Sequence, residues 1–305
     1  MKAERARILA DFRVKPGDLI GEGIESLVYA LGPAHVLRLP KAGKFPAGSR
    51  AALQALLTAI AGRLPFATPR IEEIGPDERW TIDARLPGRP LARFLKTAHD
   101  DARDRALRAY AEAVDAIAAI RLDDAAYGHL VAPHPVTAPD WRLFLREMLD
   151  RFRSRNRVTI AKEIGDPYAL QDKAADMIIS LPELPTRSLV HGDYFPGNVL
   201  IGAGLEVTAV LDFGPYTVCG DPVLDLAVAC LSLELIDETT AHDARFVRDI
   251  MIERHGEDIL PAFRFYRAWL AFSMADPANA APPYPKLYGW SIMMLRLLAE
   301  GRLPL

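Results

Sequence analysis

Residues 189–225 read LVHGDYFPGNVLIGAGLEVTAVLDFGPYTVCGDPVLD, and this stretch decides the fold. Two short apolar segments enclose a loop that carries Asp193 and Asn198. A further apolar segment leads to Asp212, which directly precedes Phe-Gly. Apolar runs bounded by turn residues are typical of short strands, so the pattern predicts that neighbouring strands bring these three polar side chains together.

The spacing of the three side chains suits phosphoryl transfer. Asn198 follows Asp193 by five positions, and Asp212 follows Asn198 by fourteen. Phosphoryl transfer needs a base that orients the attacking hydroxyl and oxygen ligands for the Mg²⁺ on the nucleotide phosphates. We therefore expect Asp193 to be the catalytic base and Asn198 and Asp212 to be Mg²⁺ ligands. Asp and Asn are also common in plain turns; one such turn alone would favour that interpretation, but both in this order favour the chemistry.

The motif H-G-D-x-x-x-x-N, followed by D-F-G and G-D-P-x-x-D, resembles the aminoglycoside phosphotransferase and choline kinase superfamily. The resemblance implies an α+β, bilobal, protein-kinase-like fold. Its small N-terminal lobe would hold an antiparallel sheet, and its larger C-terminal lobe would be mostly helical. It also implies ATP or GTP as the phosphoryl donor, Mg²⁺ as the cofactor and a small-molecule hydroxyl as the acceptor.

The short segment after Asp212 disfavours a protein as the acceptor. Asp221 follows nine positions later, too few for the activation segment of a protein kinase, and no A-P-E motif follows. The resemblance implies an aminoglycoside or macrolide antibiotic as acceptor and antibiotic resistance as the role. A choline, sugar or amino-alcohol kinase remains an alternative. So does a nucleotide-binding pseudokinase, although the intact set of three polar residues counts against it.

Composition excludes several classes of protein. The chain has 305 residues, a net charge of −3 and a pI near 6.2, so nucleic acid is a poor partner. No apolar run reaches the ~18 residues of a membrane helix, and the first residues lack the apolar core of a secretory signal. Cys219 and Cys230 are not in a C-x-x-C arrangement, so reduced thiols and a cytoplasmic location are expected. The oligomeric state stays open.

A glycine-rich segment near the N-terminus predicts a nucleotide loop. Residues 21–28 read G-x-G-x-x-S-x-V, with Gly21, Gly23 and Ser26 at the spaced positions. The segment resembles the kinase loop whose backbone approaches the phosphates without interference from Cβ atoms. Two spaced glycines alone are more often a plain turn, but these precede a strand pattern and the catalytic motif.

The strand predicted at residues 36–40 should carry a phosphate-binding cation. The resemblance implies a Lys there, and this chain has Arg38, with Lys41 as the alternative. Arg38 keeps the charge and can bind phosphate oxygens through two nitrogens, although a solvated strand Arg is the simpler interpretation. A helix predicted at residues 49–64 carries Gln54 where kinases place a Glu, so we expect Gln54 to hydrogen-bond Arg38.

The boundary between lobes is predicted near residue 85. Segments 71–75 and 80–86 read as a hairpin, and the following ARLPGRPL resembles the linker between kinase lobes. The resemblance implies that backbone groups from Asp83 to Arg85 pair with the adenine edge. Residues 1–85 would form the nucleotide-binding lobe and residues 86–305 the catalytic and acceptor-binding lobe.

Helices are predicted through most of the second part. In residues 101–122 one stripe recurs at helical spacing: Leu107, Tyr110, Val114 and Ile117. Asp221-Pro222 predicts the start of a helix at 223–235. The resemblance implies that Asp225 on this helix braces the catalytic loop and that His191 has a structural role.

An acidic run suggests where a cationic acceptor would bind. Residues 232–260 hold eight acids and three arginines, including Glu234 and Asp237. Carboxylates raise the local concentration of ammonium groups, and Tyr266 and Trp269 follow as candidate contacts for an acceptor. A solvated acidic helix face explains the same run without a ligand, and the aromatic residues are also typical of a core.

Overall fold

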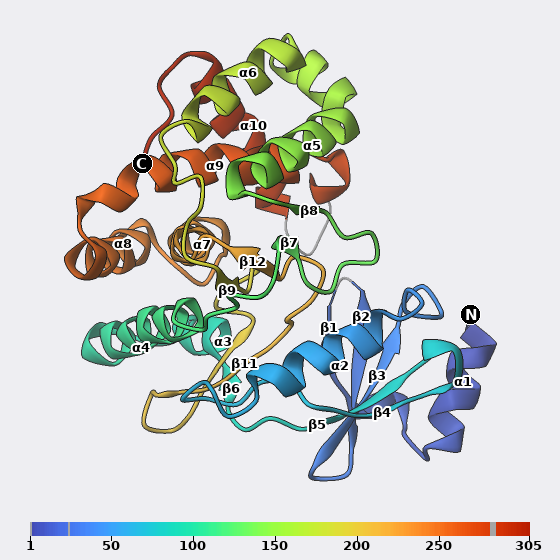
Figure 1. The fold of residues 1–305 in the computed structure, drawn as a ribbon. Helices are drawn as coiled ribbons and strands as arrows, with labels where there is room; N and C mark the ends of the chain where they lie inside the picture. Colours follow the sequence, from blue (N-terminus) through green and yellow to red (C-terminus); the bar gives the residue numbers. More distant parts are fainter. Residues whose placement is uncertain (1, 24, 281–284) are drawn as a thin grey trace.

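The computed structural model describes residues 2–23, 25–280 and 285–305. Figure 1 shows a small part built on strands, at the lower right, and a larger helical part above and to the left of it. Short strands β9, β11 and β12 lie between these two parts. The predicted α+β fold, with a small antiparallel sheet and a larger helical part, is confirmed.

The N-terminal sheet has five antiparallel strands in the order β1-β2-β3-β5-β4. Their bounds are Leu19–Glu22, Ser26–Leu31, His35–Pro40, Ile71–Ile74 and Thr81–Ala84 for β1 to β5. The alternation in β3 buries Leu37 and Leu39 against helix α1 (Lys2–Asp11), in a separate small core with Leu27 and Tyr29.

Helix α2 (Ser49–Ile60) packs into the large hydrophobic core and not into the small core beside α1. Its buried residues Leu53, Leu57 and Ile60 recur at spacings of four and three, which places them on one helix face. That face joins the large core that continues through the helical part. The segment after α2 also contacts strand β11, because the Ala67 amide donates to the Thr208 carbonyl at 2.9 Å.

The helical part is organised around α7 (Val223–Leu235), which is apolar on nearly all sides and buried. The predicted stripe of α4 faces this core, and its four residues are fully buried. The remaining helices are α3 (Leu91–Leu95), α4 (Asp100–Ala118), α5 (Trp141–Glu163), α6 (Pro167–Ile178), α8 (Ala241–His255), α9 (Leu260–Met274) and α10 (Pro285–Ala299). Among the described residues no helix is both long and apolar enough to cross a membrane.

Two small sheets hold the predicted catalytic segments in place. One has the order β11-β10-β6, and the other has the order β8-β7-β12-β9. Their bounds are Arg89–Pro90 (β6), Tyr127–His129 (β7), Thr137–Ala138 (β8), Ser188–Val190 (β9), Val199–Ile201 (β10), Val207–Val210 (β11) and Val218–Gly220 (β12). Strand β9 ends directly before the loop of residues 191–198, and β10 begins directly after it. Sheet pairing therefore fixes both ends of that loop.

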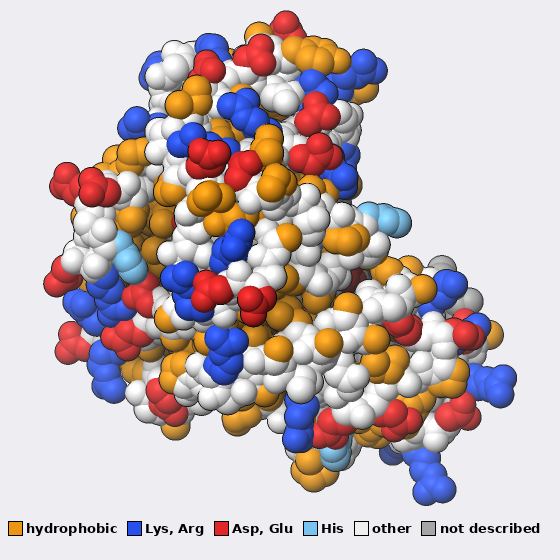
Figure 2. Space-filling model, in the orientation of Figure 1, with side chains coloured by type: hydrophobic (Ala, Val, Ile, Leu, Met, Phe, Trp, Pro, Cys, Tyr) orange, Lys and Arg blue, Asp and Glu red, His pale blue; other side chains and the backbone are white. Residues whose placement is uncertain are grey.

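The face of the molecule drawn in Figure 2 shows no field of a single sign. On the face drawn in Figure 2, Lys and Arg side chains are interspersed with Asp and Glu side chains over both parts of the molecule. The same view shows an indentation at the right, where the strand part meets the helical part. Interspersed charges on this face fit the small net charge.

Removing the indole of Trp141 should destabilise the protein by about 3–5 kcal/mol. The ring is fully buried, stacks on Phe144 at 4.9 Å between centroids and donates to the Tyr266 hydroxyl at 2.9 Å. Trp141→Ala would leave a cavity, whereas Val158→Ala on the same helix removes a side chain that is 76% exposed. Urea unfolding should therefore show a large loss for the first variant and a change within about 0.5 kcal/mol for the second. Equal effects would contradict this packing.

Candidate active site

The catalytic loop runs from His191 to Asn198 between β9 and β10. Gly192 has φ +78°, and a Cβ atom there would clash with the backbone carbonyl of Tyr216. Only glycine meets both conditions without strain. The tight approach brings the segment after Asp212 alongside the loop.

Asp193 and Asn198 face each other within this loop. The Asn198 side-chain nitrogen donates to the Asp193 carboxylate at 3.2 Å and to the Asp193 backbone carbonyl at 3.0 Å. Since Nδ2 makes both bonds, Asn198 Oδ1 is the atom left to bind a cation. Burial raises the pKa of Asp193 to about 7, with a further contribution from the charge of Asp212, and the Asn198 bond opposes this shift. A carboxyl that titrates near neutral pH suits a general base.

Asp212 reaches the same place from the end of β11. It is the third of the predicted polar residues, its side chain is 52% exposed, and its φ of +56° is unusual for a residue other than glycine. Backbone strain of this kind persists where the surrounding structure holds it, often at functional sites. Here the Leu211 amide donates to the Asn198 carbonyl at 2.7 Å, which ties the two segments together.

His191 and Asp225 brace the loop from below. The Asp225 carboxylate accepts hydrogen bonds from the amides of His191 at 2.5 Å and Gly192 at 2.8 Å. Burial lowers the pKa of His191 to about 4, so the ring is neutral near pH 7. Its Nδ1 accepts from the Asp193 amide at 3.2 Å, and its Nε2 donates to the Leu211 carbonyl at 2.7 Å. The neutral imidazole therefore connects Asp193 to the segment that presents Asp212.

The donor set fits a hard divalent cation. The Asp212 carboxylate and the Asn198 amide oxygen are oxygen ligands, and Mg²⁺ is commonly held by one or two such side chains together with phosphates and water. Within residues 2–23, 25–280 and 285–305, no group of three or more His, Cys, Asp and Glu could hold a metal.

Arg38 joins this site from the N-terminal sheet. Its Nη1 lies 3.4 Å from Asp212 Oδ1 and 3.2 Å from the hydroxyl of Ser26, at the end of the glycine-rich loop. The alternative cation, Lys41, instead pairs with Glu22 at 2.7 Å. The loop glycines Gly21 and Gly23 lie at the end of β1 and just after it. The structure thus brings together Ser26, Arg38 and Asp212 from three separate segments.

Of two predictions about the nucleotide side of the site, one is wrong and the other stays a prediction. Gln54 does not bond Arg38, because its side-chain amide donates to the Ile71 carbonyl at 2.9 Å. The amides of Ala84 and Arg85 donate to the carbonyls of Arg70 and Ala34 within the protein, and the adenine contact expected of the backbone groups from Asp83 to Arg85 stays a prediction. Asp83, predicted to act through its backbone, lies inside the sheet and uses its carboxylate to bond Arg38 at 3.0 Å.

The role of that Asp83 carboxylate was missed from the sequence. One signal was available, because an acid in the middle of a short buried strand needs a cationic partner. The partner itself depends on the sheet register, which pairs Arg38 with Thr81 and so places Asp83 two residues along on the same face.

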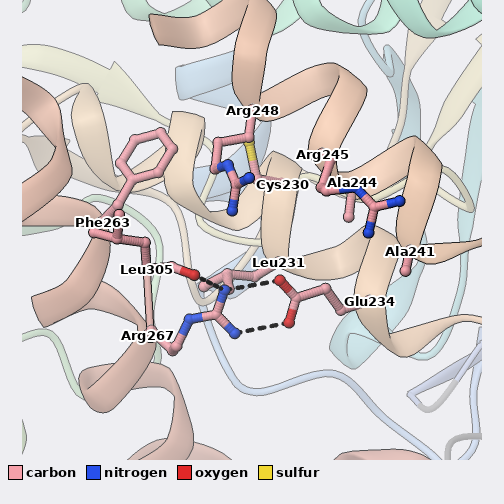
Figure 3. A pocket seen from close by; sticks show the side chains of 10 residues that line it. All are labelled: Cys230, Leu231, Glu234, Ala241, Ala244, Arg245, Arg248, Phe263, Arg267 and Leu305. Carbon is pink, nitrogen blue, oxygen red and sulfur yellow. Dashed lines mark hydrogen bonds and ion pairs between the residues drawn. The ribbon is translucent and has the colours of Figure 1, made fainter. Parts of the chain in front are cut away.

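Both acidic residues of the predicted acceptor site have a cationic partner within the protein. Glu234 forms a two-point ion pair with Arg267 at 2.7 Å, in a cavity of about 360 Å³ that Arg245 and Arg248 also line (Figure 3). Asp237 pairs with Lys286. The contact of Glu234 and Asp237 with an acceptor stays a prediction.

The predicted aromatic contacts differ from each other. Tyr266 is fully buried and bonds Asp221 at 2.5 Å and Trp141 at 2.9 Å, so it belongs to the core and cannot contact an acceptor. Trp269 is partly buried, with its ring edge-on to Phe152 at 5.1 Å. Its contact with an acceptor stays a prediction.

Comparison with known sequences decides the family. The sequence model described as the phosphotransferase enzyme family matches residues 18–289, which is most of the chain. The chain belongs to this phosphotransferase family. The resemblance seen in the motifs is thereby confirmed, and the enzyme is a phosphotransferase. The comparison with curated proteins finds no match.

Solved structures of other phosphotransferases share the fold at low sequence identity. ADP-bound aminoglycoside phosphotransferase APH(2'')-Ib is 13% identical, with a TM-score of 0.66 over 100% of both chains. The GDP and kanamycin complex of APH(2'')-IIIa is 17% identical, with a TM-score of 0.63 over 99% of both chains. Macrolide 2'-phosphotransferase MphH from Brachybacterium faecium is 18% identical, with a TM-score of 0.57 over 94% of this chain and 95% of that one. The phosphotransferase fold therefore extends over essentially the whole chain.

The activity of this phosphotransferase should rise with pH through about 7. kcat/KM reports the protonation of the free enzyme, in which Asp193 can accept a proton only when it is ionised. Burial raises the pKa of that carboxyl to about 7, so the inactive protonated fraction falls as pH increases past this value. Asn198, Asp212 and Asp225 are the neighbouring groups that set this pKa. A flat kcat/KM profile from about pH 6 to 8, with the fold intact, would contradict the assignment of Asp193 as the base.

Proposed function

We propose that this phosphotransferase moves the γ-phosphoryl group of ATP or GTP to a hydroxyl of a small molecule of the aminoglycoside or macrolide class. The observation that carries the proposal is the meeting of Asp193, Asn198 and Asp212 with Arg38 at one place between the two parts of the chain. These groups supply a base, two oxygen ligands and a phosphate-binding cation, which are the parts that phosphoryl transfer requires.

The proposed acceptor class is based on the solved structures that share this fold. They include complexes of aminoglycoside phosphotransferases with kanamycin, gentamicin and streptomycin, and a macrolide 2'-phosphotransferase. Several of those structures also hold GDP, ADP or ATP, which supports a purine nucleotide as donor. The acidic run gives no independent support, since Glu234 and Asp237 are paired within the protein.

In the proposed reaction the acceptor oxygen forms a bond to the γ-phosphorus while the bond between that phosphorus and the β,γ-bridging oxygen breaks. The hydroxyl proton passes to Asp193, and the nucleoside diphosphate leaves. Asn198 and Asp212 would hold Mg²⁺, which when bound neutralises charge on the phosphates. Arg38 would bind phosphate oxygens, and the loop at Gly21 and Gly23 would cover them.

Asp193→Ala should lower kcat by about 10²- to 10⁴-fold while leaving the nucleotide Kd nearly unchanged. The carboxylate faces Asn198 within the loop, and a general base acts on the acceptor proton rather than on the nucleotide. Asp193→Asn is the matched variant, because it keeps the shape and removes the basic oxygen. Turnover would be followed by release of the nucleoside diphosphate in the presence of acceptor, and Kd by calorimetry. Full turnover in both variants would exclude Asp193 as the base.

Asp212→Ala should abolish the Mg²⁺-dependent part of nucleotide affinity. The exposed carboxylate is the charged oxygen ligand of the proposed cation site, and alanine offers no replacement. Asp212→Asn should have an intermediate effect, because it keeps one oxygen ligand without the charge. Kd for the nucleotide would be measured with Mg²⁺ and with a chelator. If Mg²⁺ tightens binding to the alanine variant as much as to the wild type, the cation is held elsewhere.

A further inference from the structure

A buried ion pair lies within the N-terminal sheet behind the nucleotide site. Arg38 on β3 donates through Nε to Asp83 Oδ2 on β5 at 3.0 Å. Asp83 is only 4% exposed, and the antiparallel register places its side chain on the same face of the sheet as that of Arg38. The two residues are 45 positions apart, so the pair exists only when the sheet has formed.

Different nitrogens of the Arg38 guanidinium bond different partners. Nε points back to Asp83, whereas Nη1 points to Ser26 at 3.2 Å and Asp212 at 3.4 Å. None of the hydrogen bonds between described residues uses Nη2. The carboxylate therefore fixes the inner edge of the planar group and leaves its outer nitrogens toward the place where phosphates would bind.

Helix α2 does not provide an anchor for this cation. Its sequence SRAALQALLTAI contains no acid, and Gln54 bonds the Ile71 carbonyl instead. The charged residue that α2 does carry is Arg50, whose pKa is lowered by burial and by the charge of Arg38. Within the N-terminal part, Arg38 is therefore held by Asp83 and Ser26 of the sheet and not by α2.

The ion pair between Arg38 and Asp83 is not expected to contribute much to the stability of the protein. Asp83 Oδ1 is buried and has no hydrogen-bond partner among the described residues. A buried ion pair with unsatisfied atoms recovers its desolvation cost incompletely, and an apolar pair of similar volume is often at least as stable. The pair is better explained by its effect on the orientation of the Arg38 guanidinium than by an effect on stability.

We propose that Asp83 is a positioning residue that orients Arg38 for the nucleotide phosphates and takes the place of an acid on helix α2. The proposal rests on the proposed function, because the nucleotide phosphates are the ligand of Arg38. Phosphate binding would then depend on the rigid pairing of β3 with β5 and would not depend on the position of α2. Asp83 does not itself touch the nucleotide in this account.

The test is the affinity for the Mg²⁺ complexes of ATP and GTP, measured by calorimetry without acceptor. Asp83→Asn keeps the volume and removes the charge, and we expect Kd for the nucleotide to rise by roughly tenfold or more, the typical effect of losing a bond to a charged group. Gln54→Ala is the control, with Kd expected within about twofold of the wild type. In steady-state assays the nucleotide KM should rise for Asp83→Asn while the acceptor KM stays constant, a split that general loss of structure would not produce.

A double-mutant cycle with Arg38→Gln separates positioning from other effects. If Asp83 acts through Arg38, Asp83→Asn should add little to the Kd of the Arg38→Gln variant. An unchanged Kd for Asp83→Asn, or an equal loss in both backgrounds, would overturn the proposal. If Asp83→Asn does not fold, Asp83→Glu keeps the charge but displaces the guanidinium, and wild-type nucleotide affinity in that variant would likewise overturn it. A wild-type protein that binds neither nucleotide would overturn the proposed function as well, whereas normal wild-type binding with an unaffected Asp83→Asn variant overturns the positioning role alone.

Discussion

The catalytic geometry depends on one carboxylate that helix α7 carries into the loop beneath the active site. Asp225 is fully buried and accepts from two consecutive amides, those of His191 and Gly192. Burial raises the pKa of this carboxyl to about 7, while the two amide bonds oppose the shift by stabilising the charged form. Charge-assisted bonds of this kind contribute about 1.5–3 kcal/mol each, so the loop and the helix hold each other in place. The remaining geometry of the site follows from this connection.

His191 connects Asp225 to the two segments that carry Asp193 and Asp212. The neutral ring accepts from the Asp193 amide and donates to the Leu211 carbonyl, one residue before Asp212. Gly192 and Asp212 both have positive φ, and the packing around them holds these conformations. Contacts within the protein therefore hold Asp193, Asn198 and Asp212 in place. Such preorganisation is what phosphoryl transfer needs, because its catalysis is mainly positioning and charge stabilisation.

Local patterns in the sequence were sufficient to predict the fold and to indicate that Asp193, Asn198 and Asp212 lie near one another. The alternation in residues 36–40, the stripe on α4 and the helix at 223–235 are formed by residues near one another in the chain, so their periodicity is visible. The spacing of Asp193, Asn198 and Asp212 likewise lies within one short stretch. What could not be predicted are partnerships between distant segments. Asp83 reaches Arg38 through the register of two strands, and Glu234 reaches Arg267 across two helices. No periodicity in the chain records such pairs, so Gln54 and the acidic run were interpreted without their actual partners.

The central claim is that Asp193, Asn198 and Asp212 form a working phosphoryl-transfer centre rather than a nucleotide-binding relic. The most direct measurement follows the γ-phosphoryl group itself, with labelled ATP or GTP, Mg²⁺ and a set of aminoglycosides and macrolides, and mass spectrometry of the acceptor. The account predicts that an acceptor gains one labelled phosphoryl group for each nucleoside diphosphate released. Tight nucleotide binding with no label in these acceptors, or in choline, sugar and amino-alcohol acceptors, would contradict it.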